Sequence, residues 1–492
     1  MNKHKLDALL WEHIPFEDLV FQGVTKLTQE NMDDLPIDDI DEFHLSRDEG
    51  YNIQIICVRK LNKVGKKTLS RHNVKKDYIA GETVAPGKIE VNLFGSYCIE
   101  LSPCYINESS GSLEKVEYKL ECYHVEGKNV EKTPTVLKEW VLNGSRTGMS
   151  FCGNSEFKYT VDGTVSGEYG DMSFPISETQ NEQEYMGRFT HINFKDTAFD
   201  IHYVGSNYGP KWSDSFSISY FEKYGRIPND EERALIRDYL SFFMGKHLMY
   251  IGNSSYDDMG NQIGFVMENP RTFGFDIESI CRNAATPPVS CEFDSIQYYI
   301  DTVQKYIVPF GEMYFKLDFS SLITSYWYAS NIAKPMDLPI LAGALEHLKR
   351  QWYKEVELNP ETVLMDKKEF SKLIGPVKEL VVKQFSETEY SERMKRMIES
   401  LNRMSVNEQL THFFDRIGIV VGRVENDALK ARNLPAHGNV GDADFEKQYK
   451  QSKVYECILC RVLLKLIGYD GEYVDYGMLG HPCKSINIPS GE

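Results

Sequence analysis

The eight residues Ala431-Arg432-Asn433-Leu434-Pro435-Ala436-His437-Gly438 lie between two long helical patterns near the end of this 492-residue chain. Apolar side chains recur at helical spacing before them, over residues 407–431, and after them, over residues 445–467. Pro435 disfavours an unbroken helix through the stretch, because proline lacks the N–H that a helix interior needs. The sequence therefore predicts two helices joined at an exposed corner.

Arg432 and His437 give this corner a chemical character. An arginine is always charged and can hold a phosphate through two N–H groups, and a histidine gains or loses a proton near neutral pH. Together they are the minimum for metal-free RNA cleavage, in which the ribose 2′-hydroxyl attacks its own phosphate. A helix break with an incidental histidine is the simpler interpretation of an isolated Arg and His. The context of the pair decides between the two.

Helical patterns dominate the chain from residue 336 onward. Amphipathic helices are expected at Leu338–Val356, Lys367–Phe385, Glu392–Met404, Asn407–Ala431 and Phe445–Ile467. Helices joined by loops of this length predict an antiparallel bundle.

The rest of the chain predicts a different architecture. Short strands bounded by turn residues, such as those at 54–58, 89–94, 116–120 and 199–204, indicate a β-rich domain over residues 1–220 in the form of a sandwich or partly closed barrel. Residues 221–335 form a mixed connecting region. There, Asp230 is expected to cap a helix that stops at Gly245, residues 247–251 and 263–267 to form a hairpin, and residues 292–308 to be helical. The Tyr326-Trp327-Tyr328 cluster suits a core better than a base-stacking surface. The predicted fold class is α+β.

The net charge of −18 is distributed unevenly. Residues 336–492 hold 22 Lys and Arg against 24 Asp and Glu, which leaves 33 against 49 for residues 1–335. A nearly neutral helical domain can carry a local basic surface, and phosphate binding depends on local charge. Arg416, Arg423 and Lys430 are spaced by seven on the helix expected at 407–431. We expect them to share one face, which could follow an RNA backbone. A solvated helix face is the alternative.

The motif resembles the signature of HEPN ribonucleases, in which four to six residues separate an arginine from the histidine that follows it. Here Arg432 is followed by the polar Asn433, and four residues separate Arg432 from His437. The following segment, which ends Leu466-Ile467-Gly468-Tyr469, is similar to that of ApeA-type defence proteins, and the β-rich front half resembles the domain that accompanies it.

This resemblance implies a metal-independent endoribonuclease that acts in bacterial defence against phage. It also implies a homodimer in which two motifs face each other, with His437 as the general base, Arg432 as the stabiliser of phosphate charge and Asn433 as an orienting residue. tRNA is a first candidate for the RNA substrate, and a phage component for the trigger. No cofactor is required for the cleavage.

A second group of residues has ligand types that suit a structural zinc ion. Cys457 and Cys460 are three apart on the last helix, and His481 and Cys483 follow twenty residues later. The alternative is two buried helical cysteines and an unrelated tail.

Several function classes find little support. No apolar run is long enough to span a membrane, and the ten scattered cysteines favour the cytoplasm. A hydrolase site in the β-rich half lacks a nucleophile motif. The remaining rival is a non-catalytic module that binds RNA or a nucleotide and senses a partner, and such a module would not need His437.

Overall fold

The computed structural model divides the chain into two compact units, residues 1–287 with 291–304, and residues 288–290 with 305–492. Residues 221–287 thus belong to the first unit and residues 305–335 to the second. The structure describes residues 19–22, 27–30, 41–60, 88–93, 97–101, 104–111, 115–129, 132–144, 153–155, 161–167, 170–176, 185–204, 214–259, 262–290, 296–356, 364–432 and 445–492.

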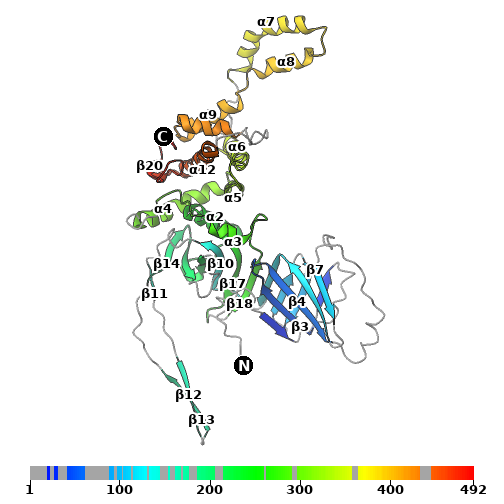
Figure 1. Ribbon diagram of the computed structural model, residues 1–492, viewed down its shortest axis with the longest axis vertical. Coiled ribbons are helices and arrows are strands. Elements are labelled where there is room, and N and C mark those ends of the chain that lie inside the picture. Colours follow the sequence, from blue (N-terminus) through cyan, green and yellow to red (C-terminus); the bar gives the residue numbers. More distant parts are fainter. Residues whose placement is uncertain are drawn as a thin grey trace, which may run out of the picture. The chain divides into compact units, whose positions relative to one another are not determined.

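The first unit is rich in antiparallel β-structure (Figure 1). One sheet of its described part has the strand order β1 (Leu19–Gln22), β3 (Glu42–Arg47), β4 (Ile53–Lys60), β8 (Lys115–Cys122) and β7 (Cys104–Gly111). The larger sheet has the order β11 (Gly153–Ser155), β14 (Tyr185–Phe194), β15 (Thr197–Val204), β16 (Asp214–Phe221), β10 (Val136–Gly144), β17 (Met249–Tyr256), β18 (Gln262–Glu268), β9 (His124–Asn129), β6 (Tyr97–Leu101), β5 (Lys88–Leu93) and β2 (Leu27–Glu30). Strands β12 (Val161–Gly167) and β13 (Gly170–Ile176) pair with each other.

The strands form where turn residues bound short β-branched runs. The runs expected at 54–58, 116–120 and 199–204 lie in β4, β8 and β15, and the expected hairpin is the β17–β18 pair. Of the run expected at 89–94, residues 89–93 lie in β5 and residue 94 lies outside the described residues. Residues alternate between buried and partly exposed along β3, as the period of a strand with one core-facing side requires. The predicted β-rich front half is confirmed.

Helix α2 (Asp230–Met244) lies in the first unit and begins one residue earlier than expected. The cap is Asn229, whose side chain accepts from the Glu232 N–H at 2.9 Å while Glu232 accepts from the Asn229 N–H at 3.1 Å. Asp230 is the first helical residue, so its assignment as the cap was wrong. Gly245 ends the helix in the left-handed conformation, with φ of 62°, as predicted.

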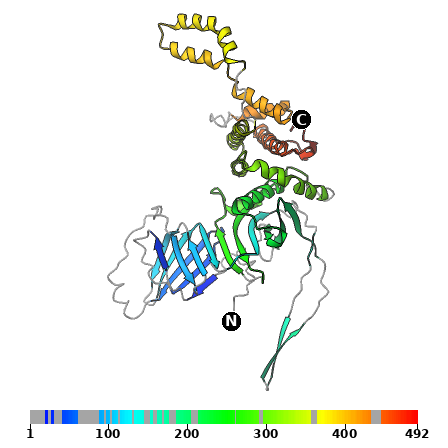
Figure 2. The same cartoon turned by 180° about the vertical axis from the view of Figure 1, so that it is seen from behind.

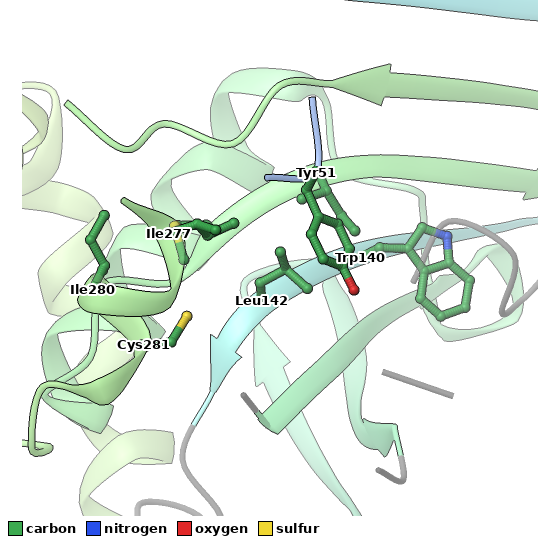
Figure 3. Close-up of a cluster of buried hydrophobic side chains, with 8 residues drawn as sticks. Tyr51, Trp140, Leu142, Ile277, Ile280 and Cys281 are labelled. Carbon is green, nitrogen blue, oxygen red and sulfur yellow. The ribbon is translucent and has the colours of Figure 1, made fainter. Parts of the chain in front are cut away.

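A cluster of apolar side chains ties the loop before β4 to the larger sheet and to α3 (Ile277–Arg282) (Figure 3). Tyr51, Trp140, Leu142 and Ile280 are all buried in it. The indole N–H of Trp140 donates to Ser254 at 3.2 Å, so the one polar atom of this large ring has a partner.

A buried charge cluster holds α2 against the larger sheet. Glu139 of β10 is fully buried and forms ion pairs with Arg233, at 3.0 Å, and with Arg237. The Tyr220 hydroxyl donates to the same carboxylate at 3.1 Å. Because the two arginines are four residues apart, they lie on one face of α2 and enclose Glu139 from the same side.

The second unit is mainly helical, which confirms the predicted α+β class (Figures 1 and 2). Helix α4 (Ile296–Tyr314) crosses the division between the units. The described helices that follow are α5 (Phe319–Ser330), α6 (Leu338–Glu355), α7 (Lys367–Phe385), α8 (Ser391–Ser400), α9 (Val406–Ile417), α10 (Arg423–Ala431) and α12 (Phe445–Leu466). Strands β19 (Glu472–Val474) and β20 (Cys483–Ser485) form a small hairpin after α12. Within the residues described, no helix is both long and apolar enough to cross a membrane.

The single helix expected at 407–431 is two helices, α9 and α10, so that prediction was wrong. Gly418 ends α9 in the left-handed conformation, with φ of 73°, and the Ile419 N–H donates back to Phe414 at 2.8 Å. At Gly422, a Cβ would lie 2.7 Å from Cβ of the Pro489 ring and 2.4 Å from the Glu492 carboxylate, so a side chain there would require the 488–492 segment to shift. The apolar spacing continued across residues 418–422 and concealed this break.

The Tyr326-Trp327-Tyr328 cluster lies in α5. Tyr326 and Trp327 are buried and pack edge to face, with ring centroids 4.9 Å apart. Tyr328 is partly exposed. The interpretation of this cluster as core is confirmed for the first two rings.

Candidate functional site

Arg432 lies at the end of α10, where a positive charge is favourable because it faces the negative end of the helix dipole. Helix α10 packs on α12, and Ala428 and Ala431 of α10 are buried. The Arg432 side chain is 16% exposed, so it is mostly covered and partly accessible to solvent.

A carboxylate from α6 fixes the direction of this guanidinium. Glu346 Oε1 accepts from Arg432 Nη1 at 3.3 Å, and Glu346 Oε2 pairs with Lys349 Nζ at 2.6 Å. Lys349 is almost fully buried. One carboxylate thus faces two cations, and the three side chains Arg432, Glu346 and Lys349 together keep a net positive charge. A partly exposed group of this kind favours an anion such as a phosphate.

Tyr455 of α12 also lies near Arg432. Its side chain is buried, and burial raises the pKa of the Tyr455 hydroxyl, while the charge of nearby Arg432 acts in the opposite direction. The hydroxyl therefore stays protonated at neutral pH. Three helices, α6, α10 and α12, meet at Arg432.

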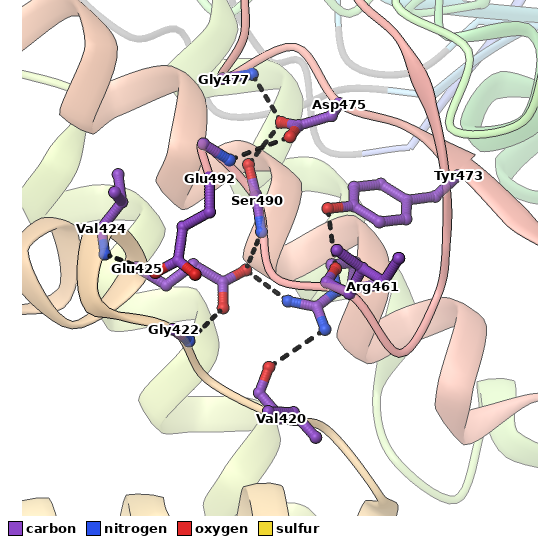
Figure 4. Close-up of polar contacts among 12 residues, drawn as sticks. Val420, Gly422, Val424, Glu425, Arg461, Tyr473, Asp475, Gly477, Ser490 and Glu492 are labelled. Carbon is purple, nitrogen blue, oxygen red and sulfur yellow. Dashed lines mark hydrogen bonds and ion pairs between the residues drawn. The ribbon is translucent and has the colours of Figure 1, made fainter.

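The beginning of α10 is fixed by a second, fully buried ion pair (Figure 4). Arg461 of α12 pairs with Glu425 of α10, and both side chains are fully buried. The Arg461 guanidinium also donates to the Ile486 carbonyl at 3.0 and 3.2 Å and to the Val420 carbonyl at 3.1 Å. The pair connects α12, α10 and the 418–422 segment, so it holds the helix that carries Arg432.

The segment 488–492 completes this brace (Figure 4). The Ser490 N–H donates to Glu425 at 3.0 Å, and the Ser490 hydroxyl donates to Asp475 at 2.6 Å. Glu492 accepts from the Val424 N–H at 3.2 Å, in the first turn of α10. Burial is the largest single influence on the pKa of the Asp475 carboxyl and raises it, but the hydrogen bonds that the carboxylate accepts and the Lys484 charge together bring the pKa below its usual value.

Two residues of the predicted motif, Asn433 and His437, lie outside the described residues. Arg432 is thus the one catalytic candidate whose surroundings the structure describes.

The predicted basic face does not exist in the expected form. Arg416 lies on α9, whereas Arg423 begins α10 and Lys430 lies near its end. All three side chains are exposed, but the break at Gly418 and Gly422 separates the first from the other two. Their spacing of seven therefore no longer places them on one helix face. A role for each of them in RNA binding stays a prediction.

The four residues considered for zinc do not come together. Cys457 and Cys460 are buried in α12, and burial raises the pKa of Cys457 to about 12. Cys483 and His481 are exposed, and the His481 ring lies 4.9 Å from that of Tyr476. Among the residues that the structure describes, no group of three or more His, Cys, Asp or Glu side chains could hold a metal ion. The buried-cysteine alternative agrees with these positions.

Glu346, Lys349 and the Glu425–Arg461 pair were not singled out from the sequence. One signal was present, because Lys349 follows Leu345 by four residues and so lies on the apolar face of α6. A lysine on such a face needs a carboxylate partner, and Glu346 is three residues away. The Glu425–Arg461 pair joins residues 36 apart in the chain, and local spacing carries no signal for it.

No protein-family model matches the chain, and no curated protein matches its sequence.

Proposed function

We propose that this chain is a metal-independent endoribonuclease that cleaves RNA at a site built on Arg432 and His437. The observation that carries the proposal is the placement of Arg432 at the end of α10. Its guanidinium pairs with Glu346, which also pairs with a second cation, Lys349, and the Arg432 side chain is partly exposed. A fixed, partly exposed guanidinium with excess positive charge suits a phosphate oxygen.

In the proposed reaction, His437 removes the proton of the ribose 2′-hydroxyl, and the 2′-oxygen forms a bond to the adjacent phosphorus. The bond from phosphorus to the 5′-oxygen breaks, and a second histidine protonates that oxygen. Arg432 stabilises the charge that develops on the phosphate oxygens. The products are a 2′,3′-cyclic phosphate and a 5′-hydroxyl.

The resemblance of the Arg432–His437 motif to HEPN ribonucleases supports the same assignment. In that family two motifs face each other across a dimer, which would supply the second histidine as the symmetry mate of His437. The resemblance to ApeA-type proteins extends the proposal to defence against phage, with a phage component as the trigger and tRNA as a first substrate to test.

Cleavage of RNA by the purified full chain tests the proposal. Arg432→Ala and His437→Ala should each abolish cleavage, since losing one transition-state contact alone lowers a rate by roughly a hundredfold or more. Both variants should keep the circular dichroism spectrum and the melting temperature of the parent chain to within a few degrees. Cleavage should persist in EDTA.

Arg393→Ala is a matched control, because Arg393 is an exposed arginine on α8. It should leave cleavage unchanged. Undiminished cleavage by either motif variant would overturn the assignment. If the parent chain binds RNA but never cuts it, with or without its trigger, the result would instead support the non-catalytic binding module.

A further inference from the structure

Two aromatic rings stand exposed at the beginning of α12, the helix that contacts Arg432. Phe445 is 65% exposed and Tyr449 is 46% exposed, although exposing a large aromatic side chain to water is energetically unfavourable. The two residues are four apart, so they lie on one face of the helix. Their ring centroids are 6.2 Å apart, with an angle of 35° between the ring planes. Together they form a continuous aromatic surface.

Positive charges outnumber negative ones along this part of the helix. Residues 445–453 contain three lysines, Lys447, Lys450 and Lys453, against the single acid Glu446. Lys453 Nζ lies 6.0 Å from the centre of the Tyr449 ring and is paired with the Glu456 carboxylate at 2.7 Å, whereas Lys447 and Lys450 are exposed. Rings flanked by lysines are the combination that binds single-stranded nucleic acid, because bases stack on the rings while the cations attract the phosphates.

The position of the rings relates them to the candidate site. Tyr449 and Phe445 precede Tyr455, the neighbour of Arg432, by six and ten residues on the same helix. At 1.5 Å per residue, they lie about 9 and 15 Å from Tyr455 along the helix axis. Both residues lie near the beginning of α12, on the side of Tyr455 that is nearer the motif in the chain.

We propose that Phe445 and Tyr449 form a stacking platform for unpaired bases, and that the substrate is therefore a single-stranded RNA segment. The proposal rests on the proposed ribonuclease function in one respect, that the bound RNA is the substrate. A duplex keeps its bases stacked inside, and the rings could not reach their faces. A loop or an unpaired tail presents those faces.

Binding by the full-length chain tests the platform without cleavage. The dissociation constant of a fluorescent twelve-nucleotide oligoadenylate would be measured in the His437→Ala background, beside a duplex of the same length. We expect the single strand to bind more tightly than the duplex. The double variant Phe445→Leu, Tyr449→Leu keeps apolar bulk but removes the ring faces, and should weaken single-strand binding roughly tenfold for each ring.

Two controls separate stacking from other roles. Tyr449→Phe keeps the ring and should bind like the parent chain, and Tyr390→Leu changes a tyrosine that is 50% exposed on another part of the unit and should also bind like the parent. Unchanged affinity in the double leucine variant would overturn the platform, as would equal binding of the duplex. A change in the association state of the double variant by light scattering, with no loss of RNA affinity, would overturn it in favour of an interface between copies.

The two proposals fail separately. If the parent chain, with His437 in place, binds RNA through the two rings but never cleaves it, the nuclease proposal fails and the platform proposal stands. If cleavage depends on His437 but RNA affinity does not depend on Phe445 and Tyr449, only the platform proposal fails.

Discussion

Replacing Glu425 by glutamine should loosen the helix that carries Arg432. The substitution keeps the shape of the side chain but removes its charge. The Arg461 guanidinium would then be fully buried without this carboxylate, and its acceptors would all be neutral: the amide oxygen of the substituted side chain and the carbonyls of Ile486 and Val420. Removing one partner of a buried ion pair costs about 3 to 5 kcal/mol, mostly because the other charge stays buried.

Hydrogen exchange measured by mass spectrometry can show which part of the chain loses stability in the Glu425→Gln variant. The two compact units need not unfold together, so one free energy of unfolding for the whole chain would be ambiguous. A loss of about 3 kcal/mol or more corresponds to exchange at least roughly a hundredfold faster. We expect this acceleration in α10 and in residues 471–492, where the pair and its neighbours lie.

The exposed pair between Glu392 and Lys395, at 2.5 Å, supplies the control. Glu392→Gln should change exchange by at most a few fold, since an exposed, solvent-screened ion pair contributes little to stability. The reasoning would be refuted if Glu425→Gln accelerated exchange in α10 by less than about tenfold, a change of roughly 1.4 kcal/mol. The double variant with Arg461→Met should lose less than the sum of the two single variants, because both charges are then gone.

Three further predictions concern the candidate site and the first unit. Glu346→Gln should lower kcat/KM for RNA by about tenfold or more, because the charge-assisted hydrogen bond that directs Arg432 is lost; unchanged kinetics would contradict this. Glu139→Gln should cost about 3 to 5 kcal/mol in urea unfolding of the first unit, since both arginines of the cluster stay buried, whereas Glu278→Gln in an exposed pair should cost about 1 kcal/mol at most. Burial lowers the pKa of His247 from 6.5 to about 4, with the Arg271 charge acting in the same direction, so its stabilising contribution is complete above pH 6.5 and is lost as the pH falls toward 4. The melting temperature of His247→Gln should accordingly vary less over that window than that of the parent chain, and an equal variation would count against this cause.

Local signals predicted much of the secondary structure. Gly245 at the end of α2, the β17–β18 hairpin and the limits of α7 and α12 all follow from residues within a few positions of the feature they mark. Cap, turn and periodicity signals are local interactions, and the sequence displays them directly.

The failures differ in cause. The apolar spacing from Leu410 to Val424 is helical and concealed the break, although Gly418, which ends α9 in the left-handed conformation, is itself a local stop signal. The close approach of Pro489 and Glu492 to Gly422 is a long-range contact that the sequence does not display. The contact of Glu346 with Arg432 likewise joins residues 86 apart. Such partners become neighbours only in the folded chain, and no window of sequence contains both.

The sequence predicted the reactive residues of the candidate site but not the residues that hold them in position. Arg432 was recognisable from its spacing to His437. The carboxylate that directs it and the buried pair that holds its helix depend on how α6, α10 and α12 pack. A motif search therefore finds the reactive groups and overlooks what positions them.

The chemistry of the RNA ends tests the central claim most directly. RNA cut by the full chain would be examined for its termini by end-specific ligation and sequencing, with the His437→Ala chain as the comparison. Attack by the 2′-hydroxyl predicts a 2′,3′-cyclic phosphate and a 5′-hydroxyl at every cut, and no such ends in the variant. A 5′-phosphate with a 3′-hydroxyl, or the same ends produced by His437→Ala, would contradict the account.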